Sequence, residues 1–315
     1  MCGLNEEQRD VVERARDALR AVIRGKDDVI ELLLVAVLGA GHALIEDVPG
    51  VGKTTFAKAL ARVFDVDFGR VQFTPDLLPS DILGSEVLNP QDGTFSFSPG
   101  PVFTNILLAD EINRASPRTQ AALLEAMNEG QVTIESRTHE LSQPFFVIAT
   151  QNPVDFQGTY PLPEAQLDRF LVRMRVGYPP PEDELQMLAD RQLADPLDDV
   201  EPVASGAQIL ELQAAVRRIE VRDRVARYML SLVQATRDHG DLELGISPRG
   251  ALALYRAAQA RAALSGRSYV SPADVQSLAE PALAHRVLTT QRARFGGTQR
   301  PAIIRGIIES VSVPT

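Results

Sequence analysis

The chain has 315 residues, 44% of them hydrophobic, and carries 32 lysines and arginines against 42 aspartates and glutamates. The resulting formal net charge of −10 disfavours non-specific binding to nucleic acid or anionic lipid. Cys2 is the only cysteine, which excludes a disulfide framework and a cysteine metal site. The most apolar run, 32–38, is far shorter than the roughly 20 residues of a membrane span. We therefore expect a cytoplasmic protein without membrane insertion, long enough for two domains.

The first 45 residues predict two helices followed by a short strand. Residues 5–23 have helical composition, and the Asn5 side chain could cap this helix by accepting from the N–H near Gln8. Residues 27–38 are apolar on most faces, which indicates a helix buried against a sheet. The apolar run 43–45 then predicts a buried strand.

The loop after this strand, E-D-V-P-G-V-G-K-T-T, predicts phosphate binding. Its glycines allow a tight turn that directs successive N–H groups toward one point at the start of a helix. A lysine there reaches the β- and γ-phosphates, and the next hydroxyl takes one place on Mg²⁺. Asp47 stands where the usual pattern has its first glycine, which leaves the loop geometry open. The predicted nucleotide-contacting residues are Pro49, Gly50, Val51, Gly52, Lys53, Thr54 and Thr55, with Thr54 also a metal ligand.

Two further apolar strands end in polar residues that suit phosphate chemistry. The run I-L-L-A-D-E predicts a buried parallel strand that delivers Asp110 and Glu111 at its carboxyl end, where ligands bind in open α/β sheets. Asp110 would hold Mg²⁺ through water, and Glu111 would orient and deprotonate the attacking water. The strand at 145–150 leads to Asn152, whose amide could bond that water or the γ-phosphate, or could simply suit a turn.

Two arginines occupy positions where a nearby anion would be favourable. Arg169 stands just before the last predicted strand, 171–176, and is either a surface ion-pair partner, which the pattern alone favours, or an arginine finger. Arg249 follows a capping serine and a proline, so it lies on a first helical turn. The helix dipole disfavours a cation there by a few tenths to about 1 kcal/mol. A phosphate or an acidic side chain nearby would reverse that cost.

The other predicted elements give the domain organisation. A strand is predicted at 71–73, a helix from Ser116-Pro117 to about 128–130, and two β-hairpins, at 86–97 around Asp92-Gly93 and at 132–146 with its tip at 136–138. An acidic, proline-interrupted connector with a helix at 182–193 follows. Helices at 207–218, 223–237, 248–264 and 272–285, with no strong strand pattern, predict an all-helical domain. We thus expect a nucleotide-binding domain at 1–178, a linker at 179–206 and a helical domain at 207–315.

Together these motifs resemble the MoxR family of AAA+ ATPases. The resemblance is carried by H-A-L-I-E-D-V-P-G-V-G-K-T-T, Q-F-T-P-D-L-L-P-S-D, L-A-D-E-I-N-R-A, A-L-L-E-A-M, A-T-Q-N-P and G-T-Y-P-L-P-E-A-Q-L-D-R-F, and it covers nearly the whole chain. It implies an α/β fold, a P-loop AAA+ αβα sandwich with a parallel sheet, followed by a small all-α lid. Asp47 matches this family's form of the phosphate loop.

The resemblance also implies roles for the candidate residues. Lys53 and Thr54 would be Walker A, Asp110 and Glu111 Walker B, Asn152 sensor 1, Arg169 the arginine finger and Arg249 sensor 2. It implies a ring, usually a hexamer, with nucleotide between subunits, and leaves open whether Arg249 serves its own nucleotide or a neighbour's. The two hairpins would correspond to the helix-2 insert and the pre-sensor-1 hairpin, which face the pore or the client in related machines.

The expected function is therefore Mg²⁺-dependent ATP hydrolysis in a ring, used for chaperone-like remodelling, maturation, or cofactor or metal insertion of client proteins. Families like this often work with proteins that carry a von Willebrand factor A domain. The alternatives are a metal-chelatase-type motor subunit and a nucleotide-gated scaffold with negligible hydrolysis, and a nucleic-acid motor is the least favoured. The client is not identified by the sequence.

Overall fold

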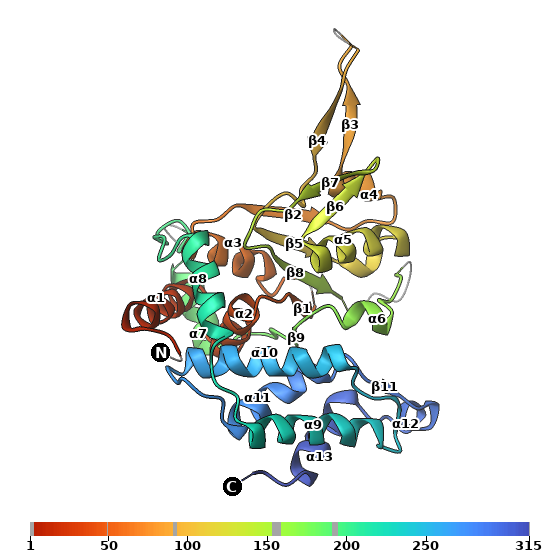
Figure 1. Cartoon of the computed structure of the whole chain (residues 1–315). Coiled ribbons are helices and arrows are strands. Elements are labelled where there is room, and N and C mark those ends of the chain that lie inside the picture. The colour runs from red at the N-terminus through yellow and green to blue at the C-terminus, as the bar shows by residue number, and fades with distance from the viewer. Residues whose placement is uncertain (1–2, 49, 91–92, 153–158, 191–194, 315) are drawn as a thin grey trace.

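The computed structural model describes residues 3–48, 50–90, 93–152, 159–190 and 195–314 (Figure 1). Its centre is a five-stranded sheet with strand order β2-β5-β8-β1-β9, in which every neighbouring pair is parallel. All five carboxyl ends therefore lie at one edge of the sheet. The predicted strand at 71–73 in fact covers 68–72, and the one predicted at 171–176 covers only 172–174. The strands are β1 (Ala43–Glu46), β2 (Phe68–Gln72), β5 (Ile106–Asp110), β8 (Phe146–Gln151) and β9 (Val172–Met174).

The three inner strands of this sheet are buried on both faces, because alternate residues of β1, β5 and β8 enter two separate hydrophobic clusters. Ile106 and Leu108 of β5 face one cluster, and Leu107 and Ala109 face the other. The predicted αβα sandwich is thereby confirmed. The first cluster contains residues of α1 (Glu6–Val22), α2 (Asp27–Leu38) and α3 (Lys53–Val63), and the second contains residues of α4 (Pro79–Leu83) and α5 (Pro117–Glu129).

Two antiparallel hairpins extend from the sheet domain, and the first projects well clear of it (Figure 1). The first pairs β3 (Gly84–Leu88) with β4 (Phe95–Pro99), as predicted, although Asp92 of its expected turn lies outside the described residues. The second pairs β6 (Gln131–Ile134) with β7 (Arg137–Glu140). The predicted span 132–146 is wrong, because the return arm ends at Glu140. The predicted tip is also displaced: the turn is at Glu135-Ser136, where both residues have positive φ.

The C-terminal part is helical, with one correction. A short antiparallel pair, β10 (Leu242–Leu244) and β11 (Leu288–Thr289), interrupts the expected all-helical pattern. At three and two residues, these strands are too short to show an alternating pattern. The helix predicted at 182–193 is described from 181 to 190. The helices are α7 (Pro181–Asp190), α8 (Gly206–Val216), α9 (Asp223–Arg237), α10 (Pro248–Leu264), α11 (Pro272–Leu283), α12 (Gln291–Phe295) and α13 (Arg300–Ser310), of which the last two were not predicted.

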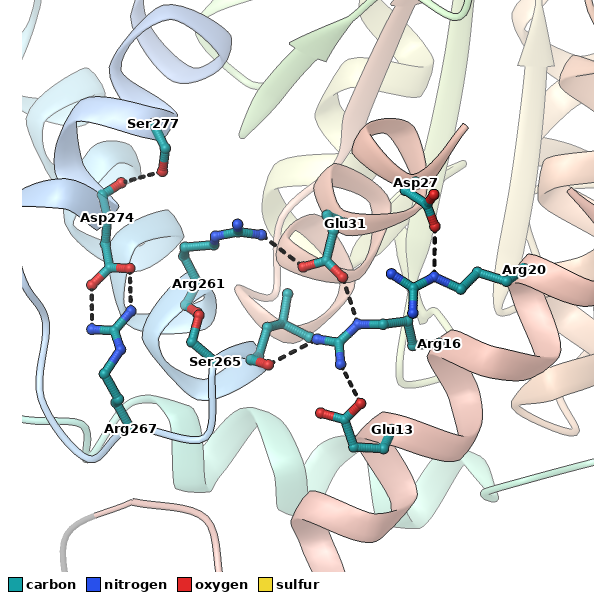
Figure 2. A network of polar contacts seen from close by, with 11 residues as sticks. Glu13, Arg16, Arg20, Asp27, Glu31, Arg261, Ser265, Arg267, Asp274 and Ser277 are labelled. Atoms are coloured by element: carbon teal, nitrogen blue, oxygen red, sulfur yellow. Dashed lines mark hydrogen bonds and ion pairs between the residues drawn. The ribbon is translucent and has the colours of Figure 1, made fainter. Parts of the chain in front are cut away.

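The sheet domain and the C-terminal helices share one core, because α10 packs along α2 within the first cluster. A buried polar network reinforces this contact (Figure 2). The Arg16 guanidinium of α1 contacts the Glu13 and Glu31 carboxylates, both at 2.5 Å, and donates to the Leu264 carbonyl at 2.8 Å. Arg261 of α10 lies 2.7 Å from Glu31. Arg16 and Glu31 thus connect α1, α2 and α10. No described helix is long and apolar enough to cross a bilayer.

Candidate nucleotide site

The predicted phosphate loop follows β1 at the carboxyl edge of the sheet and leads directly into α3. Gly50 and Gly52 have φ of 88° and 84°, and a Cβ added to either would meet no atom within 4 Å. Their open side is thus free for a phosphate. The first turn of α3 contains no acidic residue, so no side chain of that turn neutralises its positive end. Pro49 lies outside the described residues.

Asp47 has a structural role that explains its place in the loop. One carboxylate oxygen accepts from the backbone N–H groups of Val176 at 2.7 Å and Gly177 at 2.5 Å, and the other accepts from Val48 at 2.8 Å. A glycine could make none of these bonds. Asp47 therefore fixes the start of the loop to the chain that leaves β9.

A cavity of about 440 Å³ collects most of the predicted site residues. Lys53 and Thr54 come from the start of α3, Asp110 and Glu111 from the end of β5, and Asn152 from just beyond β8. Their meeting follows from the parallel sheet, which brings the carboxyl ends of β1, β5 and β8 to one edge. The lining residues are Gly50, Gly52, Lys53, Thr54, Arg70, Gln72, Asp110, Glu111 and Asn152, and we call this space the phosphate cavity.

Lys53 is a half-buried cation that forms no ion pair among the described residues. Its ammonium donates to the Asp47 carbonyl at 2.7 Å. Burial lowers the pKa of Lys53, and the charges of Asp110, Asp47 and Glu111 partly oppose that shift. A phosphate oxygen in the cavity would supply the anion that Lys53 lacks.

The two carboxylates of β5 are held by Thr150 of β8. Its hydroxyl donates to Asp110 at 2.6 Å and accepts from the Glu111 backbone N–H at 2.8 Å. Glu111 has φ 57° and ψ 47°, a left-handed conformation that costs of order 1–3 kcal/mol in a residue other than glycine. The strained turn directs Glu111 away from the strand and into the phosphate cavity.

Three side chains that the sequence analysis did not single out contact these acids. Arg70 of β2 lies 2.8 Å from Asp110, and Gln72 donates to Glu111 at 3.0 Å. Arg114 lies 2.9 Å from Glu111. Gln72 stands opposite Asp110 because β2 pairs with β5. This pairing would have pointed to Arg70 and Gln72, but a single sequence does not show it, since β2 precedes β5 by more than thirty residues.

The oxygen atoms in the phosphate cavity suit Mg²⁺ bound together with a nucleotide. The Thr54 hydroxyl and the Asp110 carboxylate are hard ligands from opposite walls. Among the described residues, no group of three or more His, Cys, Asp or Glu could hold a metal ion alone. Phosphate oxygens would therefore have to complete the coordination, as is usual for Mg²⁺ in phosphoryl-transfer sites.

A second cavity, of about 250 Å³, shares Gly50 and Gly52 with the first and extends away from the acids. Lys26 closes one side of it by donating to the Tyr178 carbonyl at 2.7 Å. Its mixed apolar lining suits a flat base stacked beside the phosphate loop. Val51 and Thr55, which were predicted to contact the nucleotide, line this base pocket. The rest of the pocket could not be predicted, because its walls come from three distant segments. They include Ile23, Lys26, Val51, Thr55, Phe56, Val176, Tyr178, Glu184 and Met187.

Arg169 and Arg249 do not line either of these spaces. Both line a third cavity, of about 400 Å³, together with Arg256 and Arg286. His42 also lines this arginine pocket and immediately precedes β1, whereas the phosphate loop follows β1. The two sites therefore lie at opposite ends of a strand about 13 Å long.

The lining of the arginine pocket contains four arginines and one acidic residue, Asp168. Arg169 donates to the Leu124 carbonyl and has no ion pair among the described residues. Burial, followed by repulsion from Arg249, lowers the pKa of Arg169, and the charges of Glu125 and Glu129 partly oppose that shift. Asp168 is already engaged, by Arg286 at 2.7 Å and by the Ser247 hydroxyl at 3.0 Å. The surface ion pair that the pattern favoured for Arg169 is not present in the part of the chain described.

Comparisons with known proteins agree with this architecture. Residues 42–172 match the profile of the ATPase family associated with various cellular activities (AAA), and residues 234–307 match the AAA lid domain. Chaperone MoxR1 of Mycobacterium tuberculosis is 39% identical over 96% of this chain and 82% of that protein. Protein MoxR of Paracoccus denitrificans is 32% identical over 94% and 93%.

Two further relatives extend the comparison. The uncharacterised protein YeaC of Bacillus subtilis is 48% identical over 98% of this chain and 97% of that protein. The crystal structure of a provisionally assigned ATPase from Cytophaga hutchinsonii aligns with a TM-score of 0.90 and 37% identity, covering 98% of this chain and 96% of that one. With a AAA sheet domain, a AAA lid and relatives of this similarity along nearly its whole length, the chain belongs to the MoxR family of AAA+ ATPases.

Proposed function

We propose that this protein hydrolyses ATP at a site that only a second subunit completes. The base would occupy the pocket beside Tyr178, and the phosphates would lie against Gly50, Gly52 and Lys53 in the phosphate cavity. The two spaces share the loop glycines, so one nucleotide can span both. Mg²⁺ held by Thr54, Asp110 and the phosphates would neutralise charge on the reacting γ-phosphoryl group.

In this proposal the chain's own residues position the attacking water. Glu111 accepts its proton, and Asn152 orients it toward the γ-phosphorus; the bond to the β-phosphate oxygen then breaks, leaving ADP and phosphate. Thr150 keeps both acids in place through its two hydrogen bonds. The contacts of Gln72 and Arg114 with Glu111, and of Arg70 with Asp110, must loosen when the nucleotide is bound.

The observation that supports a shared site is the separation of its halves. Arg169 and Arg249 lie at the opposite end of β1 from Lys53 and Asp110, and neither forms an ion pair among the described residues. Neither arginine lines the phosphate cavity of its own subunit. A head-to-tail neighbour can bring both of them there, and repetition of that contact gives a ring when the rotation between subunits closes. We propose a hexamer, in which Arg249 acts in trans together with Arg169.

We further propose that the two hairpins transmit hydrolysis to a client protein in a chaperone-like reaction. The first hairpin exposes Val87, Leu88 and Phe95 at its outer end, which projects from the body (Figure 1). At its base Phe97 stacks on His139 of the second hairpin, with ring centroids 4.0 Å apart. The two hairpins are thus one connected unit, with exposed apolar side chains at the outer ends of β3 and β4. A protein carrying a von Willebrand factor A domain is the partner we expect to present clients.

The test is ATP turnover per subunit at increasing protein concentration, with Lys53→Ala as the blank. Turnover should rise as subunits associate, and Arg169→Ala should flatten the curve. Glu111→Gln should retain ATP while abolishing turnover, which separates a motor from a nucleotide-gated scaffold. A monomer, verified by its size in solution, that hydrolyses ATP at the full rate would refute the shared site.

A further inference from the structure

Helix α10 is almost entirely buried, and its exposed residues carry a specific chemistry. Of its 17 residues only Pro248, Arg249, Leu252 and Arg256 are exposed. Arg249, Leu252 and Arg256 recur at intervals of three and four residues, so they lie on one side of the helix. Leu252 is 58% exposed between two arginines that have no ion pair within the described chain. We call Leu252 and Arg256 the α10 stripe.

Arg249 and Arg256 need different partners. Arg249 and Arg169 line the same cavity, so one anion there could contact both guanidinium groups. Arg256 lies seven residues further along the helix, about 10 Å by helical rise, with Leu252 between them. If Arg169 and Arg249 contact the γ-phosphate of a nucleotide bound to a second subunit, the α10 stripe lies farther along α10 and faces another part of that subunit's surface.

Helix α7 offers an opposite surface. It covers the base pocket with Glu184 and Met187, and it turns Leu185 and Leu188 outward, 64% and 71% exposed. None of its ten residues is buried, and none is basic. Glu182 continues the same exposed stripe one turn earlier. We call Glu182, Leu185 and Leu188 the α7 face.

We propose that the α10 stripe of one subunit docks on the α7 face of a second copy of this chain. This inference rests on the proposed ATPase and names the contact that completes its site. Leu252 would pack between Leu185 and Leu188, and Arg256 would pair with the acidic first turn of α7.

The contact has a consequence for nucleotide binding. The neighbouring subunit that places Arg169 and Arg249 at the phosphates would also contact α7, the helix that covers the base pocket. Assembly and closure over the base would then be one event. Leu185 and Leu188 point away from the base pocket, so their replacement leaves base binding by the isolated subunit unchanged.

The test uses variants that damage one side of the contact each. Leu185→Asp/Leu188→Asp removes the α7 face and keeps the α10 stripe, whereas Leu252→Asp does the reverse. Each alone should weaken self-association by about tenfold or more, the loss expected when a buried apolar anchor leaves an interface. Leu230→Asp, which changes an exposed leucine of α9 outside all three cavities, is the matched control and should assemble normally.

Mixing the two damaged variants gives the decisive result. One intact contact remains possible, between the α10 stripe of the first and the α7 face of the second, so dimers should form and ATP turnover should return. Arg169→Ala should abolish this turnover when placed in the Leu185→Asp/Leu188→Asp chain and have no effect in the Leu252→Asp chain. If each surface instead met the same surface of another copy, every mixed pair would contain one damaged partner, and mixing would give no recovery.

The outcomes separate this inference from the proposal beneath it. If the unaltered protein assembles and hydrolyses ATP while the damaged variants do so equally well, the docking surfaces are wrong and the shared site stands. If both damaged variants are impaired and their mixture stays monomeric and inactive, the pairing of these two surfaces is also refuted. If the unaltered protein shows no association-dependent turnover, the proposed function itself fails.

Discussion

Replacing Glu31 with glutamine removes the one carboxylate that Arg16 of α1 and Arg261 of α10 share (Figure 2). The Glu31 and Arg16 side chains are only 20% and 9% exposed, so the Arg16 cation is left poorly compensated in a region that water barely reaches. Breaking a buried pair typically costs about 3–5 kcal/mol. Arg16 keeps its contacts with Glu13 and the Leu264 carbonyl, which places the expected loss near the lower end, at about 3 kcal/mol.

Glu13 supplies the matched control. Its carboxylate lies at the same 2.5 Å from Arg16, but its side chain is 60% exposed. Glu13→Gln should therefore cost less than about 1 kcal/mol. The assay is the free energy of unfolding from urea titration of both variants and the parent protein at one pH. Equal losses for the two variants would refute the argument that burial, rather than distance, decides the strength of these pairs.

Three other perturbations probe the sheet domain. Burial lowers the pKa of His42 from 6.5 to about 4. As the pH falls below 6.5, the unfolded chain therefore takes up a proton at this residue while the folded chain does not. The stability that is present above pH 6.5 is lost progressively toward pH 4. Lowering the pH from 7.5 to 5.0 should therefore reduce the free energy of unfolding by about 2 kcal/mol through this group. His42→Asn should remove that part of the pH dependence. An unchanged dependence of the unfolding free energy on pH would contradict this expectation. Asp47→Asn should lower stability by about 1–3 kcal/mol, because one oxygen that accepts two N–H groups is lost, and should weaken nucleotide binding measured by fluorescence titration. Thr150→Val should reduce kcat more than it changes KM, because it frees Asp110 and Glu111, whereas Thr150→Ser should retain activity; equal rates for the two would count against that role.

The sequence was most informative where function depends on neighbouring residues. The phosphate loop, the strand that ends in Asp110 and Glu111, and the capped start of α10 are all local patterns, and the structure contains each of them. The first hairpin also follows from alternation around a turn. Parallel strands then bring Lys53, Asp110 and Asn152 together, because their carboxyl ends share one edge.

Contacts between distant segments could not be predicted in this way. Asp47 bonds to N–H groups about 130 residues later, and Arg70 and Gln72 reach the acids only through the pairing of β2 with β5. Arg16 looks like any charged residue on an amphipathic helix until α10 covers it. The short strands β10 and β11 have too few residues to form a pattern. The predicted domain boundaries at 178 and 206 remain predictions.

The most direct test of the shared site mixes two inactive proteins. Lys53→Ala lacks the phosphate-binding lysine and Arg169→Ala lacks the arginine, so neither should hydrolyse ATP alone. In an equimolar, randomly assembled mixture, about a quarter of the sites pair an intact Lys53 with a neighbour's intact Arg169, so about a quarter of the parent turnover per subunit should return. A mixture no more active than its separate components would contradict a site built from two subunits.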